Sequence, residues 1–305
     1  MDNTKHEFET HETLNGVIAT STETEFCYCS WIQIQDENGA EEMGKPIGNY
    51  ITIETDILEH GKMGDLDEIA KTVSEFLLRL TNISDDDSIL VVGIGNRNIL
   101  ADSLGVRVTD KVIPTRHTVE EINNQFGTSI RTVSVISPGV MGTTGMSTAE
   151  IVKSICSEMK PSLVILIDAL VALKTHRLYS TIQLSDTGLT PSGGISKNKN
   201  NTQTINSDYL GIPVIGIGVP TVINVANIMV DFISSFSQAF SDEELDASLI
   251  ESIHEHADSL FPSSSSFVSI KEIDVAIQYS SYIISTAINM AMLQENWLQI
   301  PYNHV

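Results

Sequence analysis

The sequence has 305 residues and is strongly acidic, with 40 Asp and Glu against 17 Lys and Arg and a formal net charge of -23. This length suits one large domain, or one domain with an appended segment. The negative charge opposes binding to phosphate backbones and anionic lipid surfaces, so we expect no nucleic-acid and no membrane partner. The longest apolar stretch, LVILIDALVAL at 163–173, is too short to span a bilayer and contains an aspartate.

The N-terminal sequence and the cysteines favour a cytoplasmic protein. Charges occur throughout the first 30 residues, which lack the apolar core of a signal peptide. Cys27 and Cys29 would share one face of a strand, and Cys156 falls in a predicted helix. An odd cysteine count without spaced pairs argues against a disulfide framework, and no CxxC or HxxxH partner follows the first two. We therefore expect ordinary reduced cysteines, no metal and no cofactor.

The first part of the chain reads as a leader, a hairpin and a helix. Residues 1–25 are polar and acidic without a sustained period, which predicts a mobile leader. CYCSWIQI and YITIET then alternate as strands do, on either side of a turn-rich segment, and predict a hairpin. Apolar residues recur at helical spacing over 65–80, which predicts a helix.

From residue 88 onward, short apolar runs alternate with helical patterns. The runs are SILVVGIG, RTVSVIS, LVILID, STIQLS and PVIGIGVP, and helices are expected to begin near 102, 147 and 221. Apolar strands without alternation indicate a sheet covered on both faces, and intervening helices indicate parallel crossovers. The predicted fold class is α/β, a three-layer α/β/α sandwich with a mainly parallel sheet. We expect this domain to cover 26–240, with a helical extension over 241–305.

A glycine-rich turn follows the first of these runs. In VVGIGNRNILADSLG, at 91–105, Gly93 and Gly95 come directly after the predicted strand. The dinucleotide-binding pattern G-x-G-x-x-G requires a third glycine where Asn98 stands, so a cofactor loop is not supported. A sharp strand-to-helix turn is the remaining reason for these glycines, because glycine tolerates positive φ.

Two aspartates lie where the ends of buried strands are predicted. Asp168 is the last residue of LVILID, and Asp102 follows the glycine turn. A carboxylate in such a place is costly to desolvate, so it needs either a hydrogen-bonding role, such as a helix N-cap, or a reactive role. Sites in parallel sheets lie outside the carboxyl ends of the strands, where the two could meet. One ionised and one protonated carboxyl group would then serve as general base and general acid.

Six blocks of the sequence resemble the germination proteases of endospore-forming bacteria. They are GIGNRNILADSLGVRV, TRH at 115–117, SPGVMGTTGMSTAEI, KPSLVILIDALVAL, STIQLSDTGLTPSGG and LGIPVIGIGVPTVI, within about 48–238. The resemblance implies a core similar to the endopeptidases that mature nickel-iron hydrogenases. It also implies an atypical aspartic endopeptidase that degrades small acid-soluble spore proteins during germination, with Asp102 and Asp168 as the catalytic pair.

The resemblance carries further expectations. We expect Asn96, His117 and Asp186 to orient the pair or the substrate. Members of this family are made as zymogens, so the resemblance implies that residues 1–25 are a candidate propeptide. It also implies a homotetramer, located in the cytoplasm of the forespore or in the spore core. Two alternatives stay open. One is a metal-dependent maturation-type endopeptidase in which Asp102, Asp168 and a histidine such as His117 bind a nickel-like ion. The other is a catalytically silent spore protein that binds partners through the same fold.

Overall fold

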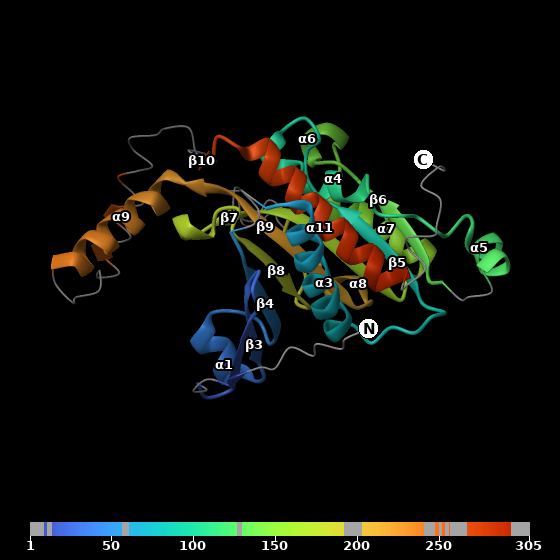
Figure 1. Cartoon of the computed structure of the whole chain (residues 1–305), viewed down its shortest axis with the longest axis horizontal. Coiled ribbons are helices and arrows are strands. Elements are labelled where there is room, and N and C mark those ends of the chain that lie inside the picture. Colours follow the sequence, from blue (N-terminus) through green and yellow to red (C-terminus); the bar gives the residue numbers. More distant parts are fainter. Residues whose placement is uncertain are drawn as a thin grey trace.

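The computed structural model describes residues 9–10, 14–56, 61–126, 130–191, 203–240, 248–249, 252–253, 256 and 267–293. These residues form a ten-stranded sheet with helices against both of its faces (Figure 1). The α/β fold class and the three-layer arrangement predicted from the alternation of strands and helices are therefore confirmed.

The sheet is mixed, with three parallel and six antiparallel strand pairs among the described residues, so the mainly parallel pairing that the sequence predicts holds only for β9, β7, β5 and β6. Its strand order is β1-β2-β3-β4-β8-β9-β7-β5-β6, with β10 paired to β9. The pairs β9–β7, β7–β5 and β5–β6 are parallel, and the remaining pairs are antiparallel. The strands are β1 (Glu9–Thr10), β2 (Val17–Glu23), β3 (Tyr28–Ile34), β4 (Gly48–Glu54), β5 (Ser88–Gly93), β6 (Thr132–Ile136), β7 (Leu163–Ala172), β8 (Thr181–Ser185), β9 (Val214–Asn224) and β10 (Phe267–Val268).

The helices begin and end at local sequence signals. Ser147 and Glu150 form a reciprocal capping box at the start of α7, and Asp36 accepts a hydrogen bond from Gly39 N at the start of α1. The helical segments are α1 (Glu37–Met43), α3 (Met63–Leu80), η1 (Leu100–Asp102), α4 (Leu104–Thr109), α5 (Val119–Phe126), α6 (Met141–Thr144), α7 (Thr148–Met159), η2 (Thr175–Arg177), α8 (Ser207–Leu210), α9 (Val225–Phe240) and α11 (Ile273–Leu293). Within the described ranges, none of them is long and apolar enough to cross a membrane.

Two apolar cores lie on opposite faces of the sheet. Because neighbouring residues of a strand point to opposite faces, Ile167 packs into the core shared with α3, α4 and α11, and Leu166 packs into the core shared with α7. Burial on both faces explains why these strands are apolar at every position instead of at alternate ones.

Two predicted boundaries differ from the structure. The sequence predicts a mobile leader over 1–25, but Val17–Glu23 forms β2 and pairs with β3 along its whole length. The β-branched residues Thr20 and Thr22 favour a strand, but the polarity of the Thr and Ser side chains hides it from a search for apolar runs. The predicted extension 241–305 contains α11, which packs in the first core, and Tyr282 Oη donates a 2.7 Å hydrogen bond to Asp67 in α3. Most of 241–266 lies outside the described residues.

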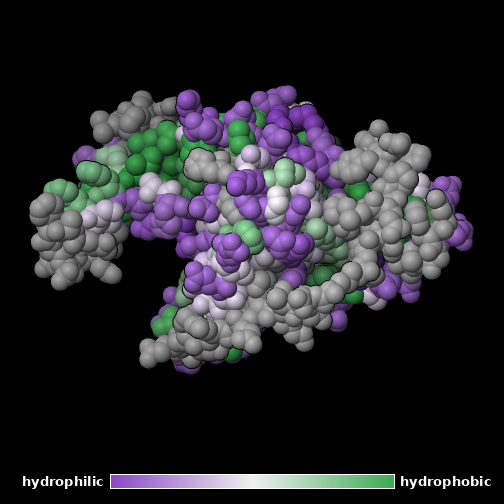
Figure 2. All heavy atoms as spheres, viewed as in Figure 1, coloured by the Kyte–Doolittle hydropathy of each residue, from purple (hydrophilic) through white to green (hydrophobic). Residues whose placement is uncertain are grey.

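The helix α9 extends away from the rest of the protein (Figure 1). Phe232 and Phe236 on this helix are 69% and 57% exposed, and Leu173 at the end of β7 is 73% exposed. Figure 2 shows apolar side chains gathered along this part of the surface. The apolar face of α9 is therefore largely uncovered within the described part of the chain.

Candidate active site

Asp168 lies inside β7, just past the end of its neighbour β5. The last β5 pairing joins Gly93 to Ile167, and Asp168 pairs on its other side with Gly218 in β9. The side chain is only 5% exposed, and Asp168 Oδ1 accepts a 2.8 Å hydrogen bond from Ala169 N. The prediction that the strand ends at Asp168 is wrong, because β9 keeps pairing with β7 as far as Ala172. The alternative role of Asp168 as a helix N-cap is excluded with it.

Asp102 is held by a closed turn that begins at the end of β5. The N–H of Asn96 donates to both the carbonyl oxygen and Oδ2 of Asp102, each at 2.9 Å. Gly95 adopts a φ of 120°, and a Cβ at this position would lie 1.9 Å from the Asp102 carbonyl oxygen. Only glycine fits both conditions. The Asp102 carboxyl group therefore binds back to its own turn, and it does not cap the helix that follows.

Two further glycines bring this turn against the two strands. A Cβ at Gly93 would lie 2.1 Å from the Gly105 carbonyl oxygen, and a Cβ at Gly105 would lie 2.4 Å from the carbonyl oxygen of Ile167. The start of α4 therefore packs directly on the backbone of β5 and β7. Because Ile167 immediately precedes Asp168, this close packing brings the Asp102 turn to the second aspartate.

The two carboxyl groups differ in their electrostatic surroundings. Burial, together with the nearby charge of Asp102, raises the pKa of Asp168 to about 8, against a smaller opposing effect of the hydrogen bond from Ala169 N. Burial also raises the pKa of Asp102, which is only half-buried and whose carboxylate is stabilised by Asn96 N. At neutral pH, Asp168 therefore carries a proton and the better-solvated Asp102 is the more readily ionised group.

A hydroxyl group in β9 fastens the turn to the sheet. Thr221 Oγ1 donates a 2.7 Å hydrogen bond to the carbonyl oxygen of Ala101, the residue before Asp102. Thr221 is fully buried and lies in a bulge, where the pairing shifts between Leu170 and Val171. The sequence patterns do not identify Thr221. Its neighbour Pro220 could have indicated the bulge, because proline within a strand marks a bulge or an edge strand.

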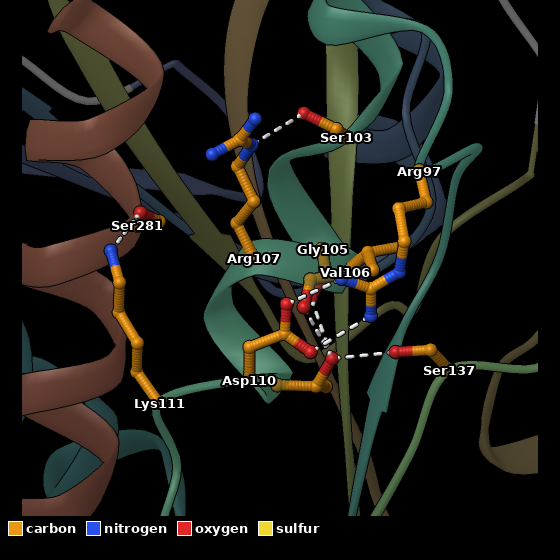
Figure 3. A network of polar contacts seen from close by, with 10 residues as sticks. Arg97, Ser103, Gly105, Val106, Arg107, Asp110, Lys111, Ser137 and Ser281 are labelled. Carbon is orange, nitrogen blue, oxygen red and sulfur yellow. Dashed lines mark hydrogen bonds and ion pairs between the residues drawn. The ribbon is translucent and has the colours of Figure 1, made fainter.

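Polar contacts also hold α4, which follows Asp102 (Figure 3). Arg97 donates two hydrogen bonds, of 2.7 and 2.8 Å, to the carboxylate of Asp110, so the turn is joined to the residue that directly follows α4. At the other end, Arg107 Nε in α4 donates a 3.0 Å hydrogen bond to the Oγ of Ser103, the residue before the helix. Both ends of the segment that carries Asp102 are thus fixed.

The other predicted site residues do not all lie at the aspartate pair. Asn96 does, through its backbone N–H, and its side chain accepts a 3.0 Å hydrogen bond from Asn98 N. His117 follows a turn bound to Val133 near the start of β6. Val133 pairs with Ile89, so the turn lies five residues, about 16 Å, from the level of Asp168 along the sheet.

Asp186 lies at the opposite edge of the sheet from the pair. It follows β8, which runs antiparallel to β9, so this strand ends beside the start of β9. Its carboxylate accepts hydrogen bonds from Asn49 N at 2.7 Å and Asn49 Nδ2 at 2.6 Å. There Asp186 lines a cavity of about 790 Å³, together with Ser162 and Val214.

The metal-dependent alternative requires a third ligand beside the two aspartates. Among the described residues, no group of three or more His, Cys, Asp and Glu side chains is placed to hold a metal ion. The register of β6 separates the His117 turn from Asp168, so the set Asp102, Asp168 and His117 is not assembled. The residues present do not fit that site.

A pair of aspartates placed by a glycine turn and a buried strand fits an acid–base hydrolase, and comparisons with known proteins give the family. The model of the germination protease family matches residues 1–267. A germination protease of Caldanaerobacter subterraneus subsp. tengcongensis is 39% identical over 272 residues, covering 86% of this chain and 83% of that protein. One from Clostridium perfringens is 37% identical over 273 residues, with the same shares covered. The chain belongs to the germination protease family, and it is therefore a peptidase, a hydrolase of peptide bonds connected with spore germination.

A solved structure is also similar in part. The [NiFe] hydrogenase maturation protease HycI from Thermococcus kodakarensis KOD1 is 17% identical, with a TM-score of 0.29, over 58% of this chain and 92% of that one.

Proposed function

We propose that the chain is an aspartic-type endopeptidase that initiates degradation of small acid-soluble spore proteins during germination, with Asp102 and Asp168 activating the attacking water. The observation that carries the mechanism is the pair itself: a buried aspartate whose pKa is raised to about 8, partly by the charge of a second, better-solvated aspartate. Two carboxyl groups with separated pKa values can act as an acid and a base at the same pH.

The reaction needs two proton transfers. The Asp102 carboxylate takes a proton from water while the water oxygen attacks the carbonyl carbon of the peptide bond. The Asp168 carboxylic acid donates its proton to the leaving nitrogen as the C–N bond breaks. Activity should then fall as the pH drops and Asp102 becomes protonated, and it should fall as the pH rises through about 8 and Asp168 loses its proton.

Cleavage of a small acid-soluble spore protein tests the proposal. The purified chain should give discrete fragments, whereas Asp102→Asn and Asp168→Asn should each reduce cleavage by at least about a hundredfold, since each removes a proton-transfer group. Asp208→Asn, on the exposed first turn of α8, is the matched control and should cleave at the wild-type rate. Equal cleavage by either active-site variant would refute the pair. Absence of cleavage by the wild-type chain at any pH would favour the catalytically silent alternative.

Family membership supports the substrate and the place of action. We place the enzyme in the cytoplasm of the forespore or spore core, where small acid-soluble spore proteins would be its substrate. We also propose that the enzyme is made as a zymogen with a propeptide shorter than residues 1–25, because Val17–Glu23 pairs in the sheet as β2. A propeptide should therefore end before Val17, and mass spectrometry of the processed chain should locate its new N-terminus there.

The exposed face of α9 supports assembly of the enzyme as a homotetramer. Contiguous apolar side chains on a protein surface mark interaction sites, and Phe232, Phe236 and Leu173 are all more than half exposed. Self-association would cover this face with a second copy of the chain.

A further inference from the structure

Cys27 and Cys29 form a close thiol pair that the peptidase reaction does not use. Their sulfur atoms are 3.6 Å apart, and both cysteines are free. They lie where the turn between β2 and β3 meets β3, with Cys29 fully buried and Cys27 6% exposed. Residues two apart on an extended backbone have Cα atoms about 6.6 Å apart, which lies within the range that a disulfide spans.

The surroundings of Cys27 stabilise its thiolate. The Cys29 thiol and the Thr24 hydroxyl, at 3.3 Å from Cys27 Sγ, can both donate to this sulfur. The hydrogen bond from Cys29 is the largest cause that lowers the pKa of Cys27, and those from Thr24 and Thr72 add to it. Together they bring the pKa to about 7, although burial opposes the shift. The pKa of Cys29 is raised by its bond to Cys27, by burial and by the charges of Cys27 and Glu75. One sulfur is therefore the nucleophile and its neighbour keeps its proton.

A cavity gives small molecules access to Cys27. It has a volume of about 390 Å³, and Cys27 is one of its lining residues. Four carboxylic residues and one histidine also line it: Glu23, Glu25, Glu54, Asp56 and His176. This negative lining repels anionic oxidants and disulfides that carry carboxylates, whereas an uncharged hydroperoxide enters without an electrostatic penalty.

We propose that Cys27 is a peroxide-reactive cysteine and that Cys29 is its resolving partner. The Cys27 thiolate attacks one oxygen of a hydroperoxide and forms a sulfenic acid, while the other oxygen leaves as hydroxide, or as alkoxide from an organic peroxide, and takes up a proton. The Cys29 sulfur then attacks the Cys27 sulfur, which forms the disulfide and releases water. Overall, two thiols lose two electrons and two protons, and hydrogen peroxide is reduced to two molecules of water.

Thiol counting and mass spectrometry of the full chain test this site. After treatment with hydrogen peroxide, the number of free thiols should fall from three to one, with the loss of two hydrogen masses in the peptide that contains Cys27 and Cys29. A reductant should restore all three. Cys156 is the internal reference, because it is buried in the other core and burial raises its pKa. Cys27 should react more than about tenfold faster than Cys156, since the thiolate is the reactive form.

Two variants separate the roles of the sulfurs. Cys29→Ser keeps a hydroxyl donor beside Cys27 but cannot resolve the intermediate, so a sulfenic acid should accumulate at Cys27 and be trapped by dimedone. Cys156→Ser should form the Cys27–Cys29 disulfide at the wild-type rate. The proposal is overturned if the wild-type chain keeps three free thiols in peroxide, or if Cys156 is oxidised as fast as Cys27. Far-ultraviolet circular dichroism shows whether each variant is folded before the measurement.

Discussion

Asp168 is a carboxyl group that the fold accommodates at the expense of stability. Its pKa is raised to about 8 because burial removes water from the ionised form and Asp102 adds a like charge. Within the described part of the chain, its carboxyl group accepts a hydrogen bond only from the N–H of the next residue, which stabilises the charge only in part. A residue that serves only packing would be apolar at this position of β7, as Leu166 and Ile167 are. The burial of an acid here is better explained by chemistry.

Asp168→Asn should therefore raise the stability of the protein while it removes activity. In the folded state Asp168 holds its proton up to a pKa of about 8, whereas in the unfolded chain it ionises near the ordinary aspartate pKa of 3.8. As the pH rises from 3.8 to about 8, the free energy of unfolding of the wild-type protein should decrease, by up to about 1.4 kcal/mol per pH unit from this group. The asparagine variant lacks this slope, so its advantage in urea denaturation should grow from pH 4 to pH 8.

Asp110→Asn should change the free energy of unfolding in the opposite direction, lowering it at neutral pH. The hydrogen bonds and charge of Arg97 lower the pKa of Asp110, so this carboxylate stabilises the folded state at neutral pH and the effect is lost as the pH falls. Its replacement should weaken the protein slightly at pH 7 and hardly at all in acid. A gain in stability at pH 7 from both substitutions would point to a general effect of lowering the negative charge of the chain.

At the scale of elements, the turn between β5 and α4 requires glycines, because its backbone packs directly against neighbouring backbone atoms. Gly95→Ala would set a Cβ 1.9 Å from the Asp102 carbonyl oxygen at a φ of 120°. We expect a loss of about 2 kcal/mol in stability and more than tenfold in kcat, because a displacement of about 1 Å in a catalytic group has large effects on rate. Gly142→Ala is the control, since a Cβ there would meet no atom within 4 Å beyond its chain neighbours and the backbone of its own helix. Thermal unfolding and the cleavage assay should separate the two variants.

The contact between β9 and η1 is a second test of how the elements place Asp102. Thr221→Val keeps the shape of the side chain but removes the hydroxyl that donates to the Ala101 carbonyl oxygen. Stability should fall by about 1–3 kcal/mol because a buried acceptor loses its donor. The value of kcat should fall while KM changes little, since Thr221 positions Asp102 and does not bind substrate. Thr221→Ser should restore most of kcat, and failure of this rescue would contradict a positioning role for the hydroxyl.

At the scale of the whole molecule, sequence patterns predict the sheet better than they predict which residues meet at its rim. Apolar runs locate β5, β7 and β9, because burial on both faces requires them. The end of a strand, however, predicts the position of a site residue only when the direction of the strand in the sheet is known. Asp168 and Asp186 both follow apolar runs, but β8 is antiparallel to β9, so Asp186 lies at the far edge. His117 is separated similarly, because its turn returns to the start of β6.

Long-range pairing also explains why the boundaries of the domain differ from those predicted. The polar strand β2 is stabilised by its neighbour β3, and α11 packs on α3, some 200 residues earlier in the chain. Neither partner is visible in a local window of sequence. The turn that holds Asp102, by contrast, is local, and its glycines are sufficient to predict a sharp turn between β5 and the helix that follows.

The largest-scale prediction concerns α9, whose side chains Phe232 and Phe236 are more than half exposed. Phe232→Glu places a charge on the exposed face of this helix, where Phe232 is 69% exposed. If this face joins copies of the chain, burying an unpaired carboxylate there should shift a tetramer to smaller species in analytical ultracentrifugation. Met63→Glu, at an exposed apolar position at the start of α3, is the matched control and should leave the assembly intact. Circular dichroism should be unchanged in both variants, because neither side chain belongs to a core. A wild-type chain that sediments as a monomer, or a Phe232→Glu variant that remains tetrameric, would show that α9 does not mediate self-association.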